Sequence, residues 1–225
     1  MNPRALPRRL IYHHLPLAVA SVACFLLVYA LTKSSTYLPF RLSMATAYTG
    51  TLLLGVTLAL GVFKVLRGES SPISTDWRRD VGIWAALFGL AHLVIGLNVH
   101  APGQMRTYFI YLPEQNRSFP LRLDLFGWAN HLGLLAGLLL ILLLLLSNDW
   151  SLTRFGARRW KALQRWNYVV FGFVLVHGVF YQVLEKRTAG WAITFAILSL
   201  LVILLQVLGF RRYRKQKQPS LRRRC

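Results

Sequence analysis

Six long apolar stretches constrain the fold of this chain more than any other feature of its sequence. A helix needs about 20 predominantly apolar residues to cross a hydrocarbon core of roughly 30 Å. Hydrophobic residues make up 55% of the 225 residues, which is typical of a membrane protein. We therefore predict an all-α fold, an integral membrane bundle of six transmembrane helices. The predicted spans are approximately residues 15–31, 44–63, 81–99, 125–147, 166–184 and 190–210.

The positive charge of the chain is distributed in a way that indicates its topology. The formal net charge is +20, and a nucleic-acid-binding protein would gather such an excess on one soluble face or arm. Here 20 of the 27 lysines and arginines lie before the first span, in the second and fourth connections, or after the last span. The positive-inside rule then puts both termini in the cytoplasm. We expect membrane lipid, through its anionic headgroups, as a partner of these residues, and no nucleic acid.

The spans divide the chain into three predicted parts. Residues 1–14 form a cytoplasmic N-terminal segment, residues 15–210 the six-helix transmembrane domain, and residues 211–225 a basic cytoplasmic tail that is too short to bury a core. The one long connection, residues 100–124, is rich in proline and aromatic residues. We expect it to fold over the outer face of the bundle, to dock a partner there, or to form an interfacial aromatic belt.

Three histidines lie inside the predicted spans, where ligand-capable side chains are costly and usually functional. At 1.5 Å per residue, His92 lies about 19.5 Å and His177 about 18 Å from the inner border of the membrane. The third and fifth spans run in the same direction, so the two imidazoles are expected at one level. His131 enters from the outer side and reaches about 10 Å into the core, which is nearly the same level.

Two of these histidines are predicted to hold a metal. Neutral imidazoles that face each other from two helices can bind iron from both sides of a porphyrin, and helical bundles commonly build internal cofactor sites in this way. We predict His92 and His177 as the axial ligands of a haem iron. The alternative is that each makes an interhelical hydrogen bond. His131 is predicted to hydrogen-bond a propionate or a substrate, or to replace one of the pair.

The residues around the pair favour a flat ligand. Gly89 and Gly96 lie one turn before and one turn after His92, so that side of the helix is thin and open to a macrocycle. Phe173 and Tyr181 lie one turn before and after the other histidine and are expected to flank the same plane. The remaining histidines lie at span borders, where an interfacial position explains them: His13, His14 and His100.

Two segments of the chain resemble a known family. They are WRRDVGIWAALFGLAHLVIGL from Trp77 and RRWKALQRWNYVVFGFVLVHG from Arg158. Both are similar to the ferric reductase-like transmembrane domain, whose members include ferric reductases, NADPH oxidases and the haem-binding membrane subunit of the bacterial periplasmic methionine sulfoxide reductase. The likeness is strongest to the last of these and covers roughly residues 44–210. It implies a haem b-binding protein of the bacterial inner (plasma) membrane.

The chain departs from the two-haem members of this family at two positions. Those members carry a second histidine on each of the third and fifth spans, nearer the inner side, and this chain has Arg78 and Gln164 there. Neither residue is a usual haem ligand. The resemblance therefore implies one haem per chain, on the outer pair, unless His13 or His14 supplies replacement ligands.

The resemblance also implies an electron-transfer role. Electrons from quinol, or from a separate cytoplasmic flavin reductase, would pass through the haem to a periplasmic or extracellular acceptor. The chain would be the electron-transfer subunit of an oxidoreductase, and quinone or flavin would come with the partner. Two alternative functions are also compatible with the sequence.

The first alternative is a small transporter or proton relay without haem, in which the three buried histidines carry protons. Transporters often show helices broken at mid-membrane and acidic residues inside the spans, and the predicted spans show neither. The second alternative is a membrane scaffold without a cofactor.

Overall fold

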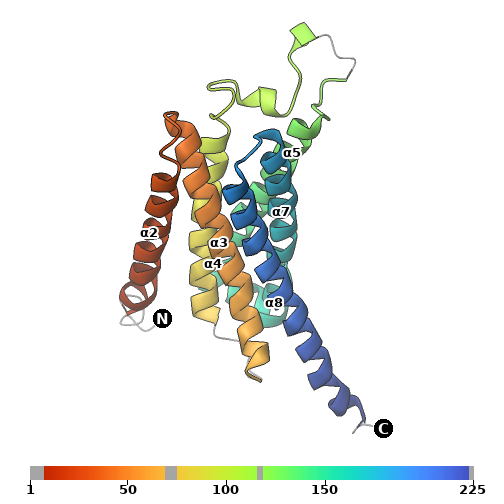
Figure 1. Cartoon of the computed structure of the whole chain (residues 1–225). Helices are drawn as coiled ribbons and strands as arrows, with labels where there is room; N and C mark the ends of the chain where they lie inside the picture. The colour runs from red at the N-terminus through yellow and green to blue at the C-terminus, as the bar shows by residue number, and fades with distance from the viewer. Residues whose placement is uncertain (1–7, 69–74, 116–118, 223–225) are drawn as a thin grey trace.

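The computed structural model describes residues 8–68, 75–115 and 119–222, so the outermost residues of both predicted cytoplasmic segments lie outside the described part. The fold in the described ranges is the predicted all-α bundle, and six helical segments are long and apolar enough to cross a membrane. The crossing helices are α2 (Leu15–Leu31), α3 (Leu38–Leu66), α4 (Thr75–Gly96), α5 (Leu125–Leu145), α7 (Asn167–Leu184) and α8 (Ala189–Arg222) (Figure 1).

The two termini lie at the same end of the bundle (Figure 1). We call this the inner end, because the positive-inside rule predicts that it faces the cytoplasm. The opposite end, called the outer end, carries the long connection between α4 and α5. That connection contains two short 3-10 helices, η2 (Met105–Tyr108) and η3 (Pro113–Gln115), and an antiparallel bridge between Ile110 and Leu121.

Helix α3 lies at the centre of the bundle and packs against α2, α4, α7 and α8. Small residues let it approach α4 closely, as is common between helices in a membrane. A side-chain carbon added to Gly50 would lie only 3.2 Å from the backbone nitrogen of Gly89. The core continues through Leu58, Val81 and Leu140. This packing places the outer half of α3 beside the helices that carry His92 and His177.

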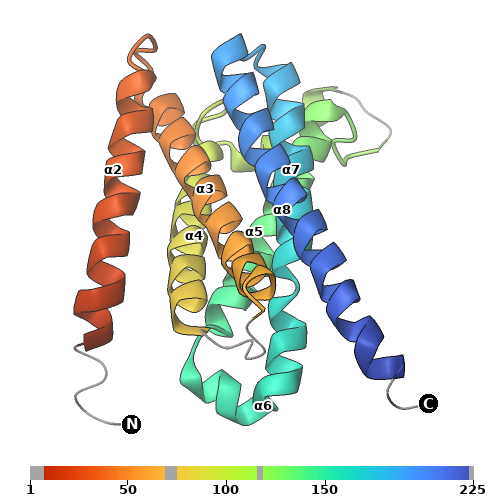
Figure 2. The same ribbon diagram turned by 60° about the horizontal axis from the view of Figure 1, so that its bottom comes forward.

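Helix α6 (Asp149–Gln164) is not among the predicted helices. It lies at the inner end between α5 and α7 (Figure 2). Asn148 caps it by accepting a hydrogen bond from the backbone nitrogen of Ser151 at 2.7 Å, and buried Trp160 donates its indole N–H to the Leu146 carbonyl at 2.8 Å. The helix is basic and amphipathic, so a search for apolar spans passes over it.

Both ends of the chain extend the bundle beyond the predicted borders. The π-helical turn η1 (Leu10–His14) leads directly into α2, and α8 continues to Arg222, well past the predicted end of the sixth span. The described part of the predicted basic tail is therefore helical. Figure 1 shows this extension projecting from the inner end.

Candidate functional site

A cavity lies between helices α3, α4, α5 and α7 in the outer half of the bundle. His92 of α4 and His177 of α7 line it from two sides. Gly89 and Gly96, the two glycines beside His92, also line the cavity, and so do four further glycines. These four come from α3, α5 and α7: Gly50, Gly133, Gly137 and Gly178.

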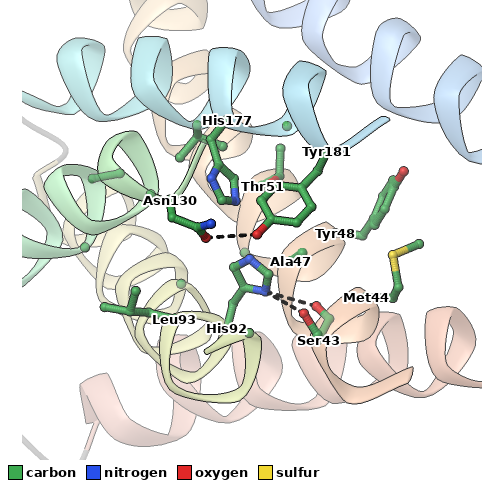
Figure 3. A pocket seen from close by; sticks show the side chains of 18 of the residues that line it. Ser43, Met44, Ala47, Tyr48, Thr51, His92, Leu93, Asn130, His177 and Tyr181 are labelled. Carbon is green, nitrogen blue, oxygen red and sulfur yellow. Dashed lines mark hydrogen bonds between the residues drawn. The ribbon is translucent and has the colours of Figure 1, made fainter. Parts of the chain in front are cut away.

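The two imidazoles face each other across this cavity. Their ring centroids lie 6.1 Å apart, and the ring planes are inclined at 78°. Figure 3 shows the rings entering the same space from the two helices. The predicted common level of His92 and His177 is therefore confirmed.

Backbone carbonyls fix the tautomer of both rings. Nδ1 of His92 lies 3.1 Å from the carbonyl oxygen of Ser43 on α3, and Nδ1 of His177 lies 2.7 Å from that of Ala129 on α5. Because a carbonyl can only accept, each Nδ1 carries the proton and each Nε2 is left with a free lone pair. This is the usual arrangement of a metal-binding histidine.

Gly133 permits the hydrogen bond between Nδ1 of His177 and the Ala129 carbonyl. It lies one turn after Ala129 on α5, where any side chain would stand against the imidazole. A Cβ at this position would lie 2.8 Å from Nδ1 of His177. The glycine therefore lets the ring approach the helix backbone.

The spacing of the rings suits a metal ion between them. A bond from a metal to an imidazole nitrogen is about 2.0–2.1 Å, and two such bonds with the two ring radii come to roughly 6.5 Å between centroids. The observed 6.1 Å is close to that value. Two imidazoles fill two positions on iron, and a porphyrin supplies the other four. The glycines also serve helix packing, because a Cβ on Gly89 would lie 2.7 Å from Leu140 and one on Gly137 2.7 Å from Leu93.

Polar side chains close the outer end of the cavity. The Tyr181 hydroxyl donates to Oδ1 of Asn130 at 2.9 Å, as Figure 3 shows. The ring of Tyr181 stacks on His100 with 6.1 Å between centroids, and Nε2 of His100 lies 2.7 Å from a carboxylate oxygen of Glu185. This hydrogen bond holds the pKa of Glu185 below its usual value. The structure thus places His100 at the site, whereas the sequence explained it as interfacial.

His131 does not join the pair. It is not among the residues that line the cavity. Its Nε2 lies 3.2 Å from the carbonyl oxygen of Arg122, and its ring is 5.7 Å from that of Phe109. His131 therefore contacts the outer connection.

The outer connection folds over the bundle, which is one of the three arrangements expected for it. Phe109 lines the cavity. Tyr108 is 1% exposed, and its hydroxyl accepts from the backbone nitrogen of His100 at 2.8 Å and donates to the Gly96 carbonyl at 3.1 Å. The connection is thereby fixed to the end of α4. Phe173, in contrast to the expectation for it, packs on the apolar core and does not line the cavity.

The inner half of the bundle contains different interactions at the positions of the missing histidines. Arg78 lies beside α3, where a Cβ on Gly61 would be 3.2 Å from its guanidinium. The side-chain oxygen of Gln164 accepts from Nδ2 of Asn167 at 3.4 Å. Neither residue lines the cavity.

His13 and His14 both lie against Asp80, which is completely buried. The ring nitrogens are 2.8 Å and 3.4 Å from its carboxylate oxygens, and Arg9 pairs with the same carboxylate. The view that no acidic residue lies inside a span is therefore wrong. We expected the third span to begin near residue 81, but α4 begins at Thr75 and includes Asp80.

Several residues of the cavity were not predicted from the sequence, although the spacing of two glycines on α5 indicates part of it. Gly133 and Gly137 are one helical turn apart on α5, so the reasoning applied to the glycines beside His92 would have applied to them too. Nothing in the spacing identifies Tyr48, Asn130 or Arg187, because only the tertiary fold brings them to the cavity.

Comparison with known proteins gives one family match. Residues 46–175 match the family described as Ferric reductase like transmembrane component. Two relatives are the Protein-methionine-sulfoxide reductase heme-binding subunits MsrQ of Yersinia pseudotuberculosis serotype O:1b (strain IP 31758) and Yersinia pestis (strain Pestoides F). Each is 29% identical over 177 residues, which cover 76% of this chain and 78% and 77% of the relatives, respectively. No solved structure matches the chain significantly.

Proposed function

This chain belongs to the family of ferric reductase-like transmembrane components, and on that premise we propose that it carries electrons through a haem b bound by His92 and His177. The acceptor lies at the outer end of the bundle. The relatives in Yersinia are named as heme-binding subunits of a reductase, which supports the choice of cofactor. The haem, when bound, supplies the exchange of one electron at a time.

The observation that carries the proposal is the arrangement of the two imidazoles. Their centroids are 6.1 Å apart, and backbone carbonyls hold the proton of each ring on Nδ1. Both Nε2 atoms are therefore prepared to bind iron before any cofactor enters. Interhelical hydrogen bonds alone would explain the Nδ1 contacts but not the cavity that both rings line.

One haem per chain fits the inner half of the bundle. Arg78 packs on α3 beside Gly61, Gln164 bonds to Asn167, and the N-terminal histidines are engaged by Asp80. Each residue that could have bound a second, inner haem therefore already contacts another part of the protein.

The donor is a quinol in the membrane or a flavin reductase at the inner end. The basic residues of α6 and four exposed ones on α8 supply a positively charged surface there, which would attract an acidic protein and anionic lipid. The four on α8 are Arg211, Arg212, Arg214 and Lys215. We assign this end to the cytoplasm of a bacterium, and the membrane to its inner membrane. At the outer end, a reductase that acts on methionine sulfoxide is the acceptor suggested by the names of the relatives.

The donor is tested by reducing the purified chain. We expect the haem absorption bands to change from the oxidised to the reduced form on addition of quinol, or of a flavin reductase with NADH. His131→Ala serves as the control, because His131 lies outside the cavity and its loss leaves both ligands in place. A chain that stays colourless after reconstitution with excess haem would overturn the proposal.

A further inference from the structure

Arg187 is a half-buried cation at the outer end of the cavity. It lies in the short connection between α7 and α8 and is one of the residues that line the cavity. Its guanidinium carbon lies 4.6 Å from the ring centroid of Phe40. Nη1 is buried and has no hydrogen-bond partner among the described residues. A buried donor without a partner is uncommon in native proteins and calls for an explanation.

Burial disfavours the charged form of the Arg187 side chain. Burial lowers the pKa of Arg187, although the charge of Glu185 acts in the opposite direction. Glu185 is the nearest candidate for a counterion, but its carboxylate is bonded to His100 at 2.7 Å. Among the described residues, Arg187 forms no ion pair. An anion inside the cavity would supply both a counterion and a hydrogen-bond acceptor for the guanidinium.

We propose that Arg187 binds a carboxylate of the tetrapyrrole, an inference that rests on the proposed haem site. A guanidinium and a carboxylate form a strong, charge-assisted hydrogen bond with a matching planar geometry. Haem b carries two carboxylates on one edge, and Arg187 lines the same cavity as the two histidines. The carboxylate edge of a bound haem would then face the connection between α7 and α8.

Reconstitution of the full-length apoprotein with two porphyrins tests this pairing. One is haem, and the other is haem dimethyl ester, whose carboxylates cannot carry charge. We expect the wild-type chain to bind haem roughly 10- to 100-fold more tightly than the ester, which is the range for a charge-assisted hydrogen bond. Arg187→Gln should bind the two compounds alike. The comparison between variants cancels the greater solubility of the ester in lipid or detergent.

Arg41→Gln is the matched control. Arg41 also lies at the outer end with its guanidinium over an aromatic ring, 3.9 Å from the centroid of Tyr29, but it does not line the cavity. This variant should keep the wild-type preference for haem over the ester. A second readout is the reduction potential of the bound haem. It should fall in Arg187→Gln more than in the control, because a nearby cation favours the reduced iron.

The possible results separate the two proposals. A preference for haem over the ester that is the same in the wild type and in Arg187→Gln would overturn the role of Arg187 and leave the histidine pair intact. The counterion would then be another anion, such as a lipid phosphate. A wild-type chain that binds neither compound would overturn the haem site itself and this inference with it.

Discussion

The ring centroids of His92 and His177 lie 6.1 Å apart, although the two residues belong to different helices, α4 and α7. Each ring is oriented by the backbone of a third helix, through Ser43 on α3 and Ala129 on α5. Four helices therefore determine the geometry of the pair. Substitutions on the supporting helices should alter cofactor binding even where they do not touch the ligands.

Gly133→Ala tests this support. The new Cβ would lie 2.8 Å from Nδ1 of His177, so the ring must move away from the Ala129 carbonyl. We expect haem affinity to fall about 10-fold, since the loss of a partner that orients a metal ligand costs 10- to 100-fold. Haem titration of the apoprotein measures this. Gly172→Ala on α7 is the control, because a Cβ there meets nothing within 4 Å. Equal affinities in the two variants would contradict the role of Gly133.

His131→Ala should retain its haem and loosen the outer connection. The imidazole contacts the Arg122 carbonyl at 3.2 Å and does not line the cavity. Hydrogen exchange over residues 105–115 and 119–122 should become faster in the variant, while the absorption spectrum stays that of the wild type. Loss of the Soret band would instead indicate that His131 binds the cofactor.

Asp80→Asn should destabilise the inner end of the bundle. The carboxylate is completely buried, raises the pKa of Arg9, and also contacts His13 and His14. Removing one partner of a buried ion pair costs about 3–5 kcal/mol, because the other charge remains uncompensated. Thermal unfolding in detergent should show a much lower midpoint than for Asp76→Asn, whose side chain is 60% exposed. Equal midpoints would show that Asp80 does not anchor the N-terminal segment.

Glu185→Gln should change how stability depends on pH. The hydrogen bond from His100 holds the pKa of Glu185 below its ordinary value, so the unfolded chain takes up this proton more readily. The resulting stabilisation is complete above the unfolded-state pKa of about 4.3 and is lost as the pH falls through the lower, folded-state value. Between about pH 6 and about pH 3, we expect the unfolding temperature to drop less in Glu185→Gln than in the wild type.

Glu114→Gln controls for acidification in general, because Glu114 is exposed on the outer connection. This variant should follow the wild-type pH profile. If Glu185→Gln follows it as well, the pair of Glu185 and His100 does not contribute to stability.

The parts of the site that depend on helix geometry could be predicted from the sequence. A constant rise per residue was enough to put His92 and His177 at one level, and apolar length was enough to identify the six spans. Depth alone does not say where a side chain points. His131 was therefore expected at the cofactor, whereas its ring contacts the outer connection.

Other features depend on contacts that local sequence does not encode. The Ala129 carbonyl and Arg187 reach the cavity only because α5 and the connection between α7 and α8 fold beside it. Asp80 belongs to α4 because this helix begins at Thr75, a few residues before the border that the apolar residues predict, and helix borders are the least certain part of such predictions.

The most direct test of the haem pair is the ratio of haem to polypeptide in the purified protein. It should be measured for the wild type, His92→Ala, His177→Ala and His131→Ala. We expect one haem per chain in the wild type and in His131→Ala, and none in the other two variants. Two haems per chain in the wild type, or a haem that remains in His92→Ala or in His177→Ala, would contradict the assignment of a single haem to this pair.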